Sequence, residues 1–166
     1  MEVFLCYNTE DKDAVSNLYE KLQGETDVKP WMDDKDLLSG RSGPQIRAAM
    51  KRADCIVVCV SNRTTVTEGA FISNIRNALD IARTKQDSAA FIIPVRLNDC
   101  SLPSIEGLSD WKSMDYFVPD GYEKLLEFLR KRVTQLEETS LEPDHPQPQS
   151  PTPHKAQCLI GYLTAP

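Results

Sequence analysis

The first 136 residues of this sequence contain no histidine. Both histidines, His145 and His154, lie in a proline-rich segment near the end of the chain. The region before that segment therefore cannot build a Ser-His-Asp or Cys-His catalytic site, or a histidine-ligated metal site. No GxGxxG follows the first apolar run, and no GxxxxGKS or GxxxxGKT occurs, so the Rossmann and P-loop phosphate cradles are excluded. We expect no metal and no resident cofactor.

Long apolar runs and a basic face are missing as well. No stretch approaches the roughly 18 consecutive apolar residues of a membrane-spanning helix, and the opening MEVFLCY has an acid where a secretory signal has basic residues. The net charge of −6 argues against direct binding of nucleic acid. The five cysteines include no CxxC pair, so we expect buried, reduced thiols. These absences predict a cytoplasmic protein with no membrane or nucleic-acid partner.

Short apolar runs alternate with helical periodicities along the chain, a pattern typical of a parallel α/β sheet. Strands are expected at 3–7, 28–32, 55–60, 89–97 and 114–118, with apolar helix stripes at 15–22, 46–53, 71–82 and 122–136. The run 55–60, CIVVCV, is apolar on both faces like a central strand, and Pro30 places its strand near an edge. We predict a flavodoxin-like five-stranded parallel sheet of order 2-1-3-4-5, with helices on both faces.

The composition divides the chain into one domain and a tail. Residues 1–136 carry the periodic pattern, whereas 142–153 contain five prolines among twelve residues. We expect 137–166 to be a proline-rich, disordered tail. Within the domain, Ser42 and Gln45 have the spacing of a capping box at a helix start.

Several polar and aromatic side chains follow the strands at one edge of the predicted sheet. Tyr7 ends the first expected strand and Asn8 follows it, Trp31 and Asp33 lie at the end of the second, and Ser61 follows the third. Ligands of open α/β sheets bind at this edge. Stacking and hydrogen-bonding groups without a metal cluster suit a nucleotide or nicotinamide better than hydrolytic chemistry. The alternative is that Tyr7 and Trp31 are core anchors and the polar groups are ordinary loop caps.

The polar segment 33–41, DDKDLLSGR, contains two apolar residues and a glycine that lets the chain turn, namely Leu37, Leu38 and Gly40. Two interpretations remain open. Both leucines fold back onto the core, or at least one is exposed and offers an anchor to a neighbouring subunit.

Five segments of the chain resemble bacterial-type Toll/interleukin receptor (TIR) domains. They are FLCYNTEDKDAV, VKPWMDDKDLLSGRSGPQIRAAMKRADCIVVCVS, IRNALDIA, FIIPVRLNDCSLP and DGYEKLLEFL. The resemblance covers about residues 2–133, so 1–136 is identified as a TIR-like domain. It implies assembly through TIR–TIR contacts in which segment 33–41, the BB loop, takes part. The implied partners are a second copy or another TIR-domain protein.

The resemblance also implies NAD as a substrate or ligand, because many TIR domains cleave its nicotinamide–ribose bond with a helical glutamate. In this chain that glutamate position falls on Asn74, within GAFISNIRNALD. A neutral amide cannot stabilise the cationic ribose as a carboxylate does. Glu68, just before the helix, is either a substitute or a solvated loop acid.

Two functions follow from the resemblance. The first is a signalling module that acts through TIR–TIR self-association or pairing, for which NAD binding without efficient turnover stays open. The alternative is an active NAD⁺ glycohydrolase that releases nicotinamide and ADP-ribose. If the correspondence holds, the Asn74 side chain faces the cleft near Tyr7 and Ser61.

Overall fold

The computed structural model of the protein describes residues 1–39, 41–64, 69–85 and 91–141. Gly40, Glu68 and the proline-rich segment from residue 142 onward lie outside these described residues, so the glycine of segment 33–41, the candidate substitute acid and most of the expected tail are not placed.

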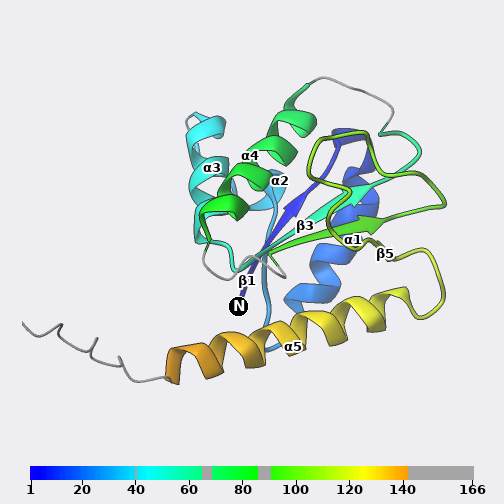
Figure 1. Ribbon diagram of the computed structural model, residues 1–166. Coiled ribbons are helices and arrows are strands. Elements are labelled where there is room, and N and C mark those ends of the chain that lie inside the picture. Colours follow the sequence, from blue (N-terminus) through cyan, green and yellow to red (C-terminus); the bar gives the residue numbers. More distant parts are fainter. Residues whose placement is uncertain (40, 65–68, 86–90, 142–166) are drawn as a thin grey trace, which may run out of the picture.

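Five parallel strands form one sheet of order β2-β1-β3-β4-β5 (Figure 1), which confirms the predicted topology. The strands are β1 Glu2–Cys6, β2 Lys29–Trp31, β3 Cys55–Val60, β4 Ile92–Arg96 and β5 Met114–Asp115. The edge strand β5 is shorter than the expected 114–118 because the chain turns away after Tyr116, whose N–H still donates to the Arg96 carbonyl at 2.9 Å.

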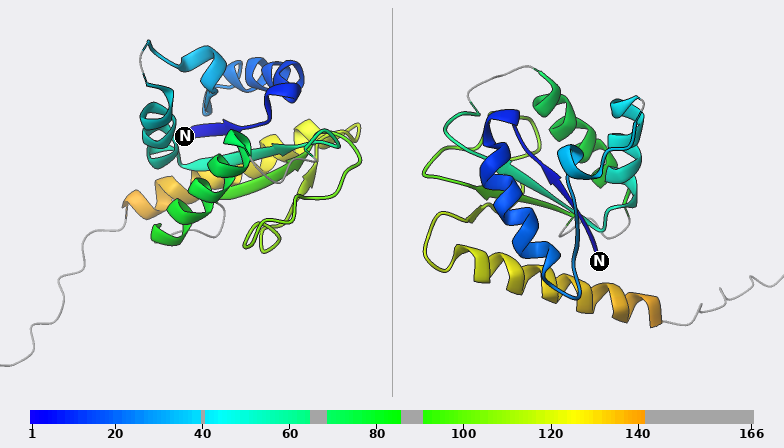
Figure 2. Two further views of the ribbon diagram at one scale, coloured as in Figure 1. Left: turned by 90° about the horizontal axis from the view of Figure 1, so that it is seen from above. Right: turned by 180° about the vertical axis from the view of Figure 1, so that it is seen from behind.

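Helices cover both faces of this sheet (Figures 1 and 2). They are η1 Thr9–Asp11, α1 Lys12–Gln23, α2 Asp33–Asp36, α3 Ser42–Arg52, α4 Ala70–Thr84 and α5 Gly121–Leu141. Buried residues of α3 and α4 form one core cluster with the sheet, and those of α1 and α5 form the other. The fold is therefore a three-layer α/β sandwich.

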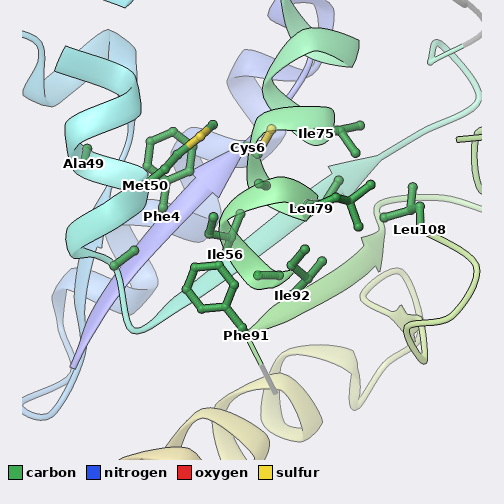
Figure 3. Packing of buried hydrophobic residues seen from close by; sticks show 14 of the residues in the cluster. Phe4, Cys6, Ala49, Met50, Ile56, Ile75, Leu79, Phe91, Ile92 and Leu108 are labelled. Carbon is green, nitrogen blue, oxygen red and sulfur yellow. The ribbon is translucent and has the colours of Figure 1, made fainter. Parts of the chain in front are cut away.

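Strand β3 is the centre of the core, and all six of its residues are buried as predicted. Because successive side chains of a strand point to opposite faces, its even-numbered residues join the cluster under α3 and α4. Its odd-numbered residues join the cluster under α1 and α5. Figure 3 shows the first cluster, in which Phe4, Met50 and Ile75 come from three different elements.

The described cysteines fit the expectation of reduced, apolar thiols. Cys6, Cys55, Cys59 and Cys100 are free, and the first three are buried. Burial raises the pKa of the Cys55 and Cys59 thiols to about 12. Both thiols therefore stay protonated at neutral pH and pack as small hydrophobic side chains.

Three local expectations need correction. The segment 33–41 begins with the short helix α2, whereas a loop was expected throughout. Ser42 is the first residue of α3 and Arg41 is the N-cap, without a side-chain capping bond, so the predicted capping box is wrong. The last helix, α5, continues to Leu141, past the expected domain boundary at residue 136.

The start of α5 lies unusually close to the end of β5. A Cβ atom at Gly121 would lie 2.4 Å from the carbonyl oxygen of Tyr116. Only glycine permits this approach without a backbone shift, so Gly121 determines how α5 sits beside β5. None of the described helices is long and apolar enough to cross a membrane.

The core assignment predicts different costs for one and the same substitution at two leucines. Leu5 of β1 is 1% exposed and Leu38 is 78% exposed. Leu5→Ala is expected to lower the free energy of unfolding by about 2–5 kcal/mol, since it removes buried methyl groups and leaves a cavity. Leu38→Ala, the matched control, is expected to change it by at most about 0.5 kcal/mol. Urea unfolding of both variants measures the difference, and equal losses would contradict the assignment.

Candidate functional site

Two of the predicted site residues, Tyr7 and Asp33, join the carboxyl ends of β1 and β2. The Tyr7 hydroxyl donates to Asp33 Oδ1 at 2.5 Å, and both side chains are half-buried. Burial, followed by this hydrogen bond, raises the pKa of the Tyr7 hydroxyl above its usual value. The hydroxyl therefore remains a donor at neutral pH and ties the end of β1 to the start of α2.

Further contacts stabilise α2 itself and connect it to helix α1. The Asp34 N–H donates to Asp33 Oδ1 at 2.9 Å, and Lys12 Nζ lies 2.7 Å from Asp34 Oδ1. Lys35 Nζ pairs with Glu20 Oε1 at 3.0 Å. Single exposed pairs of this kind contribute little stability, but together they connect the two middle residues of the four-residue helix to α1.

Ser61, directly after β3, is buried in a hydrogen-bonded cap. Its hydroxyl donates to Asp11 Oδ2 at 2.8 Å and accepts the N–H of Arg63 at 3.1 Å. Arg63 Nη1 donates to the Glu10 carbonyl at 2.8 Å. Asn8 supplies its carbonyl oxygen to the Asp11 N–H at 2.8 Å. Polar groups of the turn after β1 and of the turn after β3 therefore hydrogen-bond to one another.

Trp31 packs against the core, as the core-anchor interpretation expects. Its ring stacks on Phe4, with ring centroids 4.9 Å apart and an interplanar angle of 17°. Both rings pack with the cluster under α3 and α4, whereas Tyr7 packs with the cluster under α1 and α5. The two aromatic residues proposed for one rim thus lie on opposite faces of the sheet.

Asn74 is half-buried in α4, one residue before the buried Ile75. Helix α4 covers the face that carries Trp31. Tyr7 packs against the other face, and the Ser61 hydroxyl is bonded to Asp11, immediately before α1. The structure therefore brings Tyr7 to Asp33 and Ser61 to Asp11, whereas Asn74 belongs to a helix that covers the opposite face of the sheet from the one against which Tyr7 packs.

Between α2 and α3, the described residues 37–39 and 41 include an apolar side chain that projects into solvent. We refer to these residues as the α2–α3 loop. Leu37 is half-buried, and Leu38 is 78% exposed. One of the two leucines thus meets the description of an exposed anchor, and the other does not. Among the described residues, two large hydrophobic side chains are exposed, and Leu38 is the more exposed of the two.

A second surface feature lies beside the other edge of the sheet. A groove of about 410 Å³ runs between β5 and α5, and we refer to it as the β5–α5 groove. Its apolar lining residues are Met114, Val118 and Phe128, and its lysines are Lys112, Lys124 and Lys131. Each of its two acids lies beside a cation. Arg96 therefore lowers the pKa of the Asp115 carboxyl, and Lys131 lowers the pKa of the Glu127 carboxyl.

Sequence reasoning missed two parts of this arrangement. Asp11 lies in the polar run TEDKD, where nothing distinguishes a buried carboxylate from a solvated one. The β5–α5 groove lies between residues 112–118 and 124–131, and its shape depends on how α5 packs beside β5, which no local pattern indicates. The described residues include no cluster of three or more His, Cys, Asp or Glu side chains suited to a metal ion.

Comparisons with known proteins assign the fold to a family. A comparison with curated proteins finds no match. The structure resembles that of the TIR domain of the Toll-related receptor TRR-2 from Hydra magnipapillata, with 21% identity and a TM-score of 0.61 over 77% of this chain and 97% of that one. It is also similar to a prokaryotic SEFIR domain, with 22% identity and a TM-score of 0.41 over 92% of this chain and 98% of that one. A family model for the TIR domain matches residues 3–129, from β1 into α5. The chain therefore belongs to the TIR domain family of signalling modules.

Proposed function

We propose that this TIR domain signals by associating with a second copy, or with another TIR-domain protein, through the α2–α3 loop. The observation that carries the proposal is the exposure of Leu38, at 78%. When a partner covers an exposed leucine, apolar surface is removed from water and the free energy falls. The well-bonded segment around Asp33 gives this side chain a fixed base. We refer to the exposed Leu38 side chain on this loop as the knob, and we propose that it docks on a partner.

The surface that we propose to receive this knob is the β5–α5 groove of the second copy. Met114, Val118 and Phe128 offer an apolar floor. The charges are complementary, because segment 33–41 has three aspartates against one lysine and one arginine. The groove has three lysines against two acids. A weakly acidic segment 33–41, which carries the loop, thus meets a weakly basic rim.

A knob and a groove on different parts of one molecule make a head-to-tail contact. Where the rotation between copies does not close a ring, such a contact leaves a free loop at one end of each assembly and a free groove at the other. Association is therefore expected to continue beyond a dimer, which suits a signalling module that forms clusters.

Leu38→Asp tests the knob directly. Burying the added carboxylate in the groove would be unfavourable, so concentration-dependent association is expected to be lost. The far-ultraviolet circular dichroism spectrum should stay native because the side chain lies outside the core. Leu38→Met, which keeps an apolar side chain of similar volume, is the matched control and should associate. Unchanged association of Leu38→Asp in sedimentation velocity would remove this loop from the interface.

A mixing experiment tests the groove. Val118→Asp is expected to block the groove and leave the loop intact, whereas Leu38→Asp leaves the groove intact. Each variant alone should be monomeric, and an equimolar mixture should form a dimer, because one intact loop meets one intact groove. A mixture that remains monomeric, with both variants natively folded, would contradict the head-to-tail contact.

We propose in addition that this domain binds NAD without efficient turnover. Asn74, at the position of the family glutamate, supports this proposal because an amide carries no charge to stabilise the departing ribose cation.

Asn74→Glu is the corresponding gain-of-function test. The native protein is expected to release little nicotinamide from NAD, and the variant about 10²-fold or more above it, if the remaining pocket accepts NAD. Asn17→Glu, the same change on the exposed face of α1, is the control and should have no effect. Chromatography of nicotinamide and ADP-ribose measures the reaction. Clear native turnover that survives Asn74→Ala would favour the active glycohydrolase, and Glu68→Ala would then be the next variant.

A further inference from the structure

The side-chain amide of Gln45 contacts three backbone groups of the α2–α3 loop. Gln45 Oε1 accepts the N–H of Leu38 at 3.1 Å, and Nε2 donates to the Leu38 carbonyl at 3.1 Å. Nε2 also lies 3.4 Å from the Arg41 carbonyl. One amide thus satisfies both backbone groups of Leu38, as a neighbouring strand would. These contacts take the place of the capping role expected for Gln45.

The loop is fixed from its other end by α2. The Leu37 N–H donates to the Asp33 carbonyl at 3.2 Å. Asp36 accepts the Met32 N–H at 2.9 Å and the Tyr19 hydroxyl at 3.2 Å. The chain therefore enters the loop from a helix that is bonded to β2 and α1, and Gln45 then holds the backbone at Leu38.

We propose that Gln45 is a positioning residue for TIR association. This inference rests on the proposed function of the α2–α3 loop. By bonding both backbone groups of Leu38, Gln45 keeps the leucine side chain directed into solvent before a partner arrives. A preformed knob loses less conformational freedom on binding than a flexible one. Gln45 therefore strengthens association through Leu38, without itself having to contact the partner.

Two substitutions at Gln45 separate its acceptor from its donor. Gln45→Ala removes all three hydrogen bonds. Gln45→Glu, ionised at neutral pH, still accepts the Leu38 N–H but cannot donate to the two carbonyls. Exchange of the Leu38 amide hydrogen, measured by NMR in dilute protein, is expected to be about two- to tenfold faster in Gln45→Ala. The dissociation constant of the assembly should rise by a similar factor, with Gln45→Glu intermediate.

Gln23→Ala, at the exposed end of α1, is the matched control and should change neither quantity. The urea midpoint of Gln45→Ala should remain close to that of the native protein, since a general loss of stability is not part of the proposal. Unchanged exchange at Leu38 in Gln45→Ala would show that the amide does not hold the loop, and would overturn the inference.

Failure of this inference and failure of the proposed function give different results. If Leu38→Asp abolishes association but Gln45→Ala associates as tightly as the native protein, the loop is the interface and Gln45 does not position it. If Leu38→Asp leaves association intact, the proposed function fails and the positioning role falls with it, whatever the exchange rate at Leu38.

Discussion

A strand that is apolar at every position is stable only when both of its faces are covered, and β3 imposes this requirement on the whole domain. Its alternate side chains fill two separate clusters, one under α3 and α4 and the other under α1 and α5. Parallel pairing with β1 and β4 then follows, because each crossover must return to the same end of the sheet. The loops after β1, β2 and β3 are thereby brought to one edge, and the α2–α3 loop projects from the segment that follows β2.

The polar groups at that edge largely satisfy one another. Tyr7 is bonded to Asp33, and Ser61 is bonded to the buried Asp11. Leaving such a buried group without its partner costs about 1–3 kcal/mol, so this network fixes the turns in place. A rigid edge of this kind serves well as a base for an exposed loop. It is less suited to a site whose polar groups must be free to bind a ligand.

Much of the fold could be predicted because it depends on local periodicity. The run CIVVCV indicated a doubly covered strand, and Pro30 indicated an edge, so strand order followed from the crossover rules. The pairing of Tyr7 with Asp33 was within reach for the same reason, since both follow adjacent strands. The separation of Tyr7 and Trp31 onto two faces depends on which face of the sheet each strand position points to. Short apolar runs do not specify this.

Other features depend on contacts that local rules do not specify. The spacing of Ser42 and Gln45 fits a capping box, but α3 begins one residue earlier than that motif requires, and the amide of Gln45 bonds to Leu38. The exposure of Leu38 was one of two open interpretations, because an apolar residue in a polar loop is compatible with burial or with docking. Only the three-dimensional arrangement distinguishes these cases.

The association of the native protein tests the head-to-tail contact of Leu38 with the β5–α5 groove most directly. Sedimentation velocity over a wide concentration range measures the mass of the assembly. The weight-average mass is expected to rise with concentration and to pass that of a dimer, because each added copy presents a new free loop or groove. A mass that remains that of the monomer throughout, or that stops at a dimer, would contradict this contact.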